Sequence, residues 1–349
     1  MKIKKIAVIG SGFFGATCAI LLSKKHDVHL YEKKNSIMCG ASRANQFRFH
    51  LGYHYPRSNK TVKEIKKHYK EFINFFGNKV FDNTKNFYGI AKKKSKVSFK
   101  NYLSFLKKNS LKYKITKEKN FSREIEGQII SQEKNLNYFK IKSLILKKLK
   151  EKKIKIFFDS KFNKTLIKKY DKVIMATYDQ NNSLINLMKH KIKKKYKYEL
   201  VEKIIIKLPG KFKNKSYMVI DGKFVCVDPY VGTNYHLLSH VKHSKLEIKK
   251  GKYPNFKNLN KKYLNQGIIR NKRNSKFKDF INDGSKFLPF LKEAKYKGSF
   301  YVTRAVSIGK EKTDERLNEI SINSDKIISL FSGKWNTCVG VAKKVTKLI

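Results

Sequence analysis

Residues 4–32 read KKIAVIGSGFFGATCAILLSKKHDVHLYE. Residues 4–9 form an apolar run that is typical of a buried strand, and three glycines follow it closely. The pattern predicts an apolar helix over residues 13–25 and a second strand over residues 28–31, which ends at Glu32. A strand, a helix and a strand in this order indicate a parallel sheet, so we predict an α/β fold.

The three glycines have the spacing GxGxxG, and each has a physical task. Gly10 permits the tight turn, Gly12 lets the backbone approach a pyrophosphate, and Gly15 lets the helix pack closely on the strand. The pyrophosphate would lie at the positive end of the helix dipole. Glu32 can accept hydrogen bonds from ribose hydroxyls. The stretch therefore predicts a dinucleotide-binding domain.

The net charge of +55 comes almost entirely from lysine. Only eight of the 81 basic residues are arginine, and lysine runs such as 92–94 and 193–195 are spread along the whole chain. The abundant Lys, Asn, Ile, Phe and Tyr share A/T-rich codons. We therefore interpret the charge as a solvated lysine coat and expect no specific nucleic-acid partner. Nonspecific attraction to polyanions, or peripheral contact with anionic lipid, stays open.

The cysteines and the apolar runs indicate the class of protein. The four cysteines are far apart and form no CxxC pair, so we expect no metal site, no disulfide framework and a cytoplasmic location. No run reaches the roughly 18 apolar residues that span a bilayer. Glycines interrupt the apolar stretch after the N-terminal lysines, which argues against a signal peptide. A chain of 349 residues suggests two domains.

The pattern beyond residue 60 alternates between helices and strands and then becomes rich in strands. Helices are predicted at 61–76, at 98–108 and around 141–149, and strands at 87–91, 154–158 and 172–176. Residues 199–241 predict an antiparallel sheet, and the last 50 residues predict short strands, a glycine turn and a terminal helix. We expect a discontinuous nucleotide-binding domain of residues 1–78, 136–185 and 300–349, with a substrate domain of residues 79–135 and 186–299 inserted.

Residues 39–58, CGASRANQFRFHLGYHYPRS, carry a more specific signal. They resemble the flavin-adjacent stretch of the glycerol-3-phosphate and L-2-hydroxyglutarate dehydrogenase branches of the D-amino-acid-oxidase superfamily. Residues 332–337, SGKWNT, resemble the segment that covers the ribityl and ring end of the flavin in that family. The resemblance implies FAD as the cofactor. It also implies a Rossmann-type FAD-binding domain with an inserted α+β substrate domain built on an antiparallel sheet.

The fingerprint and the resemblance together nominate two sets of residues. The first would bind the cofactor: Gly10, Gly12, Phe13, Phe14, Gly15, Glu32, Lys33, Ser42, Asn45, Gly333, Lys334, Trp335, Asn336 and Thr337. The second would act on the substrate: His50, His54 and Arg304.

The three substrate-side residues each have an alternative structural interpretation. A histidine titrates near neutrality and can serve as a base, but His50 and His54 could equally be hydrogen-bonded structural residues. In amino-acid-oxidising relatives an arginine at a place comparable to Arg304 pairs with the substrate carboxylate, and a structural ion pair is the alternative. Arg57 has a similar interpretation. Tyr230 and His236 are weaker candidates for the substrate face.

The resemblance implies an FAD-dependent oxidoreductase that oxidises a C–H bond next to a hydroxyl or amine of a small, acidic substrate. Hydride transfer to the flavin would carry that chemistry. One alternative is a flavin-dependent enzyme similar to the nucleotide-sugar mutases, which releases no oxidised product. A second alternative, from another class, is a polyanion-binding protein with a vestigial Rossmann domain. The intact glycines and Glu32 argue against that last alternative.

Overall fold

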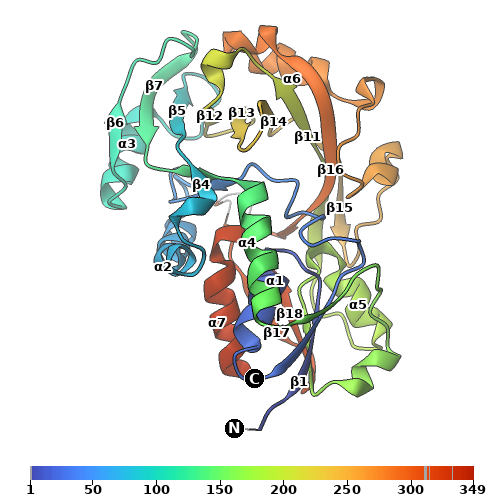
Figure 1. Ribbon diagram of the computed structural model, residues 1–349. Helices are drawn as coiled ribbons and strands as arrows, with labels where there is room; N and C mark the ends of the chain where they lie inside the picture. Colours follow the sequence, from blue (N-terminus) through green and yellow to red (C-terminus); the bar gives the residue numbers. More distant parts are fainter. Residues whose placement is uncertain (1, 310–312, 314, 332) are drawn as a thin grey trace.

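The computed structural model describes residues 2–309, 313, 315–331 and 333–349. It contains both the parallel sheet and the antiparallel sheet that the sequence predicts. Ser332, the first residue of the predicted 332–337 segment, lies outside the described residues. Figure 1 shows a lower half built on a parallel sheet and an upper half built on a larger sheet, with both chain termini at the lower end. The α/β fold class is therefore confirmed.

The first sheet has the order β17-β18-β10-β1-β2-β9. Its strands are parallel except for the edge strand β17, which runs antiparallel to β18. The buried residues of β1 are all apolar, as a strand covered on both faces requires. The strand bounds are β1 (Lys5–Ile9), β2 (Asp27–Tyr31), β9 (Lys155–Phe157), β10 (Lys172–Met175), β17 (Glu319–Ile322) and β18 (Ile327–Phe331).

Helices cover both faces of this sheet. One side carries α1 (Phe13–Leu22), α4 (Tyr138–Glu151) and α7 (Cys338–Leu348), with α2 (Asn59–Phe76) against α7. The other side carries α5 (Asn181–Leu187), whose Ile185 joins a separate apolar cluster. The helix predicted to reach Lys25 ends at Leu22, because the chain must turn there for the Asp27 amide to donate a hydrogen bond to the carbonyl oxygen of Lys4.

The second sheet contains nine strands in the described residues. Its order is β15-β11-β14-β13-β12-β5-β7-β6, and β16 pairs with β11. All pairs are antiparallel except β5 with β12, so the antiparallel sheet predicted for residues 199–241 is confirmed and extended. Its strands are β5 (Lys85–Ala91), β6 (Tyr113–Ile115), β7 (Ile125–Ser131), β11 (Tyr196–Lys207), β12 (Lys215–Ile220), β13 (Val225–Tyr230), β14 (Tyr235–His240), β15 (Lys245–Gly251) and β16 (Lys295–Ser307).

The strand β16 is longer than the short strands predicted for the C-terminal region. It pairs with β11 from Lys295 to Ser307, so the predicted domain boundary at residue 300 falls inside a strand of the large sheet. The proposed division into two domains can therefore be drawn nearer Ser307 at this point. Two short helices, α3 (Phe99–Lys108) and α6 (Phe277–Gly284), pack on the large sheet.

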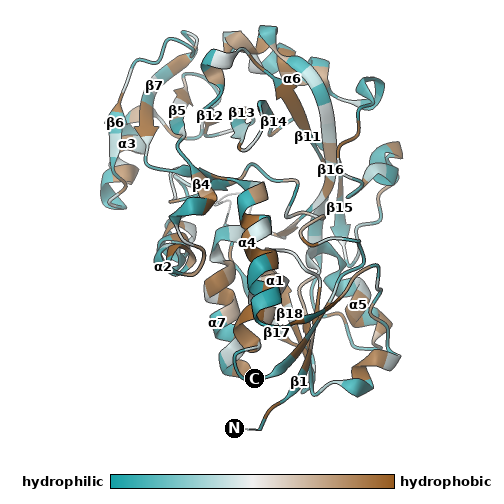
Figure 2. Cartoon of the chain, in the orientation of Figure 1, coloured by the Kyte–Doolittle hydropathy of each residue, from teal (hydrophilic) through white to brown (hydrophobic). Residues whose placement is uncertain are grey.

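A small third sheet has the order β3-β8-β4 and joins the two halves. Its strands are β3 (Arg48–Phe49), β4 (Phe81–Asp82) and β8 (Lys134–Leu136). Because β3 belongs to residues 39–58, called the flavin-adjacent stretch for the position that the resemblance implies, this sheet fixes that stretch relative to the large sheet. Figure 2 shows apolar colouring along inner strands such as β1 and hydrophilic colouring along many loops. In the part of the chain that the structure describes, no helix is long and apolar enough to cross a membrane.

Candidate functional site

The glycine turn after β1 has the geometry that its sequence predicts. Gly10 has φ +91°, and a Cβ there would lie 2.8 Å from the carbonyl oxygen of Ala176. A Cβ on Gly15 would lie 1.8 Å from the carbonyl oxygen of Gly10. A Cβ on Gly12 would meet only the Ser42 hydroxyl, at 2.9 Å. Backbone packing thus requires Gly10 and Gly15, whereas Gly12 leaves space in front of the N-terminus of α1.

Glu32 stands at the end of β2 beside this turn. One of its carboxylate oxygens accepts hydrogen bonds from the Ser11 amide (3.0 Å) and the Ser11 hydroxyl (2.6 Å), and the other accepts from the Lys34 amide at 3.0 Å. These contacts hold the carboxylate at the glycine turn, where a ribose would lie. The neighbouring Lys33 is exposed.

The stretch of residues 39–58 folds back over the start of α1. The Ser42 hydroxyl accepts a hydrogen bond from the Phe13 amide at 3.2 Å. The Asn45 side chain donates to the Ser42 carbonyl at 2.9 Å and accepts from the Phe47 amide at 2.6 Å. Asn45 therefore shapes the turn of its own segment, and its predicted contact with the cofactor stays a prediction.

The C-terminal segment reaches the same place. The Gly333 amide donates to the Asn318 side chain at 2.9 Å, and a Cβ at Gly333 would lie 2.0 Å from the carbonyl oxygen of Arg316. The Thr337 hydroxyl donates to the same Asn318 oxygen at 3.0 Å. Close backbone approach therefore requires glycine at position 333.

Three segments far apart in sequence meet through their aromatic and amide side chains. The Trp335 ring stacks on Phe13 with centroids 5.1 Å apart. The Asn336 amide donates to the carbonyl oxygen of His50 at 3.0 Å, and Lys334 Nζ lies 4.7 Å from the centroid of the Tyr55 ring. The structure thus brings together the fingerprint, the flavin-adjacent stretch and the C-terminal segment. Phe14 is buried in the core beside them.

The two histidines of the flavin-adjacent stretch lie next to each other, with ring centroids 5.9 Å apart. Burial lowers the pKa of His50 to about 4, and the positive charge of Lys334 contributes. Burial also holds the pKa of His54 well below its usual range, with further contributions from His50 and Lys334. Both imidazoles are therefore neutral near pH 7, and a neutral imidazole can accept a proton.

A buried glutamate that the sequence analysis missed faces His50. Glu133 Oε1 lies 3.6 Å from His50 Nδ1 and accepts a hydrogen bond from the Leu51 amide at 2.8 Å. Its other oxygen accepts from the Tyr88 hydroxyl at 2.5 Å. Because Nδ1 of His50 faces this carboxylate, Nε2 is the ring nitrogen that could act on another group.

A second missed residue, Arg48, ties β3 to the large sheet. Its guanidinium lies 2.5 Å from Asp228 Oδ1 and also donates to the Ser216 hydroxyl, and both charged side chains are fully buried. The guanidinium also lies 5.1 Å from the centroid of the Tyr88 ring. No local pattern marks this pair, because the partners stand 180 residues apart. The scarcity of arginine was the one available hint.

The remaining candidates occupy structural contacts. Arg304 Nε donates to the buried Glu199 carboxylate at 2.5 Å, and Lys245 lies 3.6 Å from the other oxygen of Glu199. Arg57 forms an ion pair with Asp221. A substrate anion at either arginine would have to share the guanidinium with a carboxylate, so their predicted roles stay predictions.

The two weaker candidates in the large sheet pack as ordinary interior residues. His236 is buried, and its Nε2 lies 2.8 Å from the carbonyl oxygen of Phe212. Tyr230 stacks on Phe47 with centroids 5.9 Å apart.

The residues at this site fit a bound FAD. Helix α1 begins at Phe13 with no acidic residue in its first turn, and Gly12 leaves room for a pyrophosphate there. Two buried polar atoms along the converging segments have no hydrogen-bond partner among the described residues, namely His54 Nδ1 and Asn336 Oδ1. Buried polar atoms usually have a partner, so this set is the one that a polar ligand would complete.

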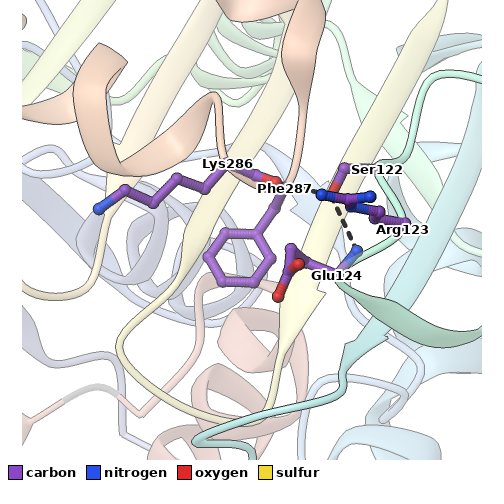
Figure 3. A pocket seen from close by; sticks show the side chains of 5 residues that line it. All are labelled: Ser122, Arg123, Glu124, Lys286 and Phe287. Carbon is purple, nitrogen blue, oxygen red and sulfur yellow. Dashed lines mark hydrogen bonds between the residues drawn. The ribbon is translucent and has the colours of Figure 1, made fainter.

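Two features of the large sheet lie apart from this site. Figure 3 shows a surface hollow lined by Ser122, Arg123, Glu124, Lys286 and Phe287, none of which is a predicted site residue. His240, His243 and Asp283 also come close enough to hold a metal ion. However, Asp283 already pairs with Lys286 at 2.8 Å and with Lys242 at 3.5 Å, and these ammonium groups would oppose a cation.

The comparisons with known proteins agree with this geometry. Residues 5–164 match the DAO family, described as FAD dependent oxidoreductase. The FAD-dependent monooxygenase FPY4 of Fusarium mangiferae is 32% identical over 72 residues, which cover 20% of this chain and 20% of that protein. The matched region is thus about a fifth of the length of that curated relative.

Two solved structures share the whole fold. Glycine oxidase from Geobacillus kaustophilus superimposes with a TM-score of 0.71 at 11% identity, covering 100% of this chain and 95% of that one. L-alpha-glycerophosphate oxidase from Mycoplasma pneumoniae, in a structure with FAD bound, gives 0.71 at 16% identity with the same coverage. The family description agrees with the prediction of an FAD-dependent oxidoreductase and of FAD as its cofactor.

Proposed function

We propose that this chain, whose residues 5–164 match the DAO family of FAD-dependent oxidoreductases, is a member of that family and oxidises a C–H bond next to a hydroxyl or an amine. The observation that carries the proposal is the convergence of three segments. Trp335 stacks on Phe13 of the fingerprint, and Asn336 donates to His50 of the flavin-adjacent stretch. These contacts support a single site at which the dinucleotide and a reacting group meet.

Within this family we propose the branch that the sequence resembles, the glycerol-3-phosphate and L-2-hydroxyglutarate dehydrogenases. The glycerophosphate oxidase of Mycoplasma pneumoniae is among the structural neighbours, which is compatible with a hydroxylated, anionic substrate. Glycine oxidase is also among them, and therefore the amine class belongs to the same proposal.

When bound, FAD supplies the hydride acceptor. The residues of the chain then have three tasks: to hold the cofactor, to orient the substrate and to take the proton from its hydroxyl or amine. His50 is the proposed base, because its ring is neutral near pH 7 and the Glu133 carboxylate that faces its Nδ1 would stabilise the protonated ring. His54 lies beside it as the second candidate. The proposed contact of the substrate anion with Arg304 would have to form beside Glu199.

The first experiment is the visible spectrum of the purified protein after incubation with excess FAD. We expect flavin absorption bands, with release of unmodified FAD on acid precipitation. The protein is then mixed anaerobically with hydroxy acids, amino acids, glycerol phosphate and nucleotide sugars, and loss of the oxidised flavin bands identifies the substrate class.

Three results would contradict the proposal. A colourless protein that also binds DNA in a strongly salt-dependent way would favour a polyanion-binding protein. Conversion of a nucleotide sugar without any oxidised product would favour a mutase. Binding of NAD in place of FAD would contradict the cofactor itself.

A further inference from the structure

Lys203 is a basic residue in the middle of the large sheet that the proposed chemistry does not yet use. It lies on β11 between Val201 and Ile205, two positions away from each. Those two residues pack in the apolar cluster that includes α1 and the flavin-adjacent stretch. Because side chains alternate along a strand, Lys203 lies on the same face of the sheet.

The contact of Lys203 Nζ confirms this orientation. It donates a hydrogen bond to Gln46 Oε1 at 3.0 Å, and Gln46 belongs to the flavin-adjacent stretch. The amide nitrogen of Gln46 donates in turn to Cys226 Sγ at 3.4 Å, on β13. Lys203 is therefore placed between the substrate sheet and the stretch that the cofactor site is built on.

Lys203 differs from the nearby arginines because no carboxylate of the described residues forms an ion pair with its ammonium. Arg48 pairs with Asp228, and Arg304 pairs with Glu199. Lys203 takes part in no ion pair within residues 2–309 and the other described ranges, and its hydrogen-bond acceptor is a neutral amide. Asp228 is already occupied, since it accepts from Arg48 and from the Cys226 thiol at 2.8 Å.

Because Lys203 is partly buried, the lack of an opposite charge beside its ammonium is unfavourable in free energy. Removal from water lowers the pKa of Lys203 to about 8, which leaves the ammonium charged for the most part at pH 7. A charged group that has lost water is stabilised by an opposite charge, and the described residues offer Lys203 none at ion-pair distance. An anionic ligand would supply that charge.

We propose that Lys203, held by Gln46, binds the anionic group of the substrate. This inference rests on the proposed function for its location, and it assigns the contact to a residue other than Arg304. A carboxylate and a phosphate both offer the anionic oxygen that an ammonium binds. A purely structural Lys203 would instead serve only to anchor Gln46.

The test compares Lys203→Met with Lys207→Met in the FAD-loaded protein. Lys207 lies on the same strand but is exposed, so the two variants lose the same charge in different surroundings. Acetate and inorganic phosphate are titrated separately at constant ionic strength. The change in the flavin absorption bands and the shift in thermal midpoint each give a dissociation constant.

We expect one or both anions to bind the wild type and Lys207→Met alike, and Lys203→Met at least tenfold more weakly. Lys203→Arg should recover part of the affinity because it keeps the charge. All variants should retain FAD.

Equal affinity in Lys203→Met and the wild type would overturn the inference. Absence of any response to either anion in the wild type would overturn it as well. Failure of the proposed function is a separate result, because it would appear as absence of the flavin. The thermal shift of the FAD-free protein would then still report on Lys203.

Discussion

The guanidinium of Arg48 lies 2.5 Å from the carboxylate of Asp228, and neither side chain is exposed to solvent. Arg48 belongs to β3, inside the flavin-adjacent stretch, and Asp228 belongs to β13 of the large sheet. The pair therefore fixes the stretch that carries His50 to the sheet that carries Lys203. Tyr88 adds an aromatic face at 5.1 Å from the guanidinium.

Loss of one partner of this pair should be strongly destabilising. Arg48→Met leaves the Asp228 carboxylate buried without its cation, and the expected cost is about 3–5 kcal/mol in the free energy of unfolding. The double variant Arg48→Met/Asp228→Leu removes both charges and should lose less than the sum of the two single variants. Urea unfolding of the four proteins measures this coupling, and additive losses would show that the pair is not a unit.

Substitutions at two glycines of the fingerprint should affect different properties, one the stability of the fold and the other the binding of FAD. A Cβ at Gly15 would lie 1.8 Å from the backbone oxygen of Gly10, so Gly15→Ala should destabilise or unfold the protein. A Cβ at Gly12 meets only the Ser42 hydroxyl, so Gly12→Val should fold and fail to bind FAD. Circular dichroism and FAD titration check the two variants. A Gly12→Val protein that binds FAD normally would contradict the predicted pyrophosphate position.

Glu32 should contribute to FAD affinity without being essential for the fold. Glu32→Ala removes the acceptor for the ribose hydroxyls and should weaken FAD binding by about 1.5–3 kcal/mol. Because the carboxylate also accepts two hydrogen bonds from Ser11, some loss belongs to the turn itself. Ser11→Ala serves as the control, since it removes only one of those bonds. A weaker effect of Glu32→Ala than of Ser11→Ala would contradict a ribose contact.

The lysine coat should have little part in catalysis. If the charge of +55 is spread over the surface, substrate turnover should persist at physiological salt. Any binding to DNA should weaken steeply between low and moderate ionic strength and show no sequence preference. Fluorescence anisotropy with two unrelated duplexes measures this. A sequence-specific complex that persists at high salt would contradict the interpretation.

The sequence predicted well those elements whose position depends on contacts between residues close together in the chain. The glycine turn between β1 and α1 lies where the sequence places it, and the Ser98 side chain caps α3 by accepting from the Asn101 amide at 3.2 Å. Strand β16 was predicted less well. It begins at Lys295, before the expected boundary at 300, because its length is set by pairing with β11.

Partners across the fold could not be predicted in this way. Glu199 and Arg304 stand 105 residues apart and meet only because β11 and β16 pair with that register. The sequence left both a substrate contact and a structural ion pair open for Arg304, because its partner Glu199 lies far away in the chain. Glu133 was missed for the same reason, because its contact with His50 depends on how β3 and β8 pair.

His50 should make the folded protein sensitive to acid. Its pKa is lowered from 6.5 to about 4, so the folded state binds fewer protons than the unfolded state between these values. The free energy of unfolding should therefore fall as pH decreases from 6.5 towards 4, with His50 contributing up to ~3 kcal/mol of that loss. His240 also has a pKa of about 4, and it adds a similar loss that is the same in every variant compared.

The variant His50→Gln removes this contribution, because glutamine does not titrate, while His54, whose pKa is also lowered, is present in both proteins. Urea unfolding at pH 7 and pH 4.5 gives the loss of stability on acidification for each protein. We expect that loss to be smaller in His50→Gln than in the wild type by about 2 kcal/mol, since most of the titration window lies between the two pH values. His190→Gln, in the loop after α5, should behave like the wild type. An equal loss in His50→Gln and the wild type would mean that His50 is not buried in its neutral form.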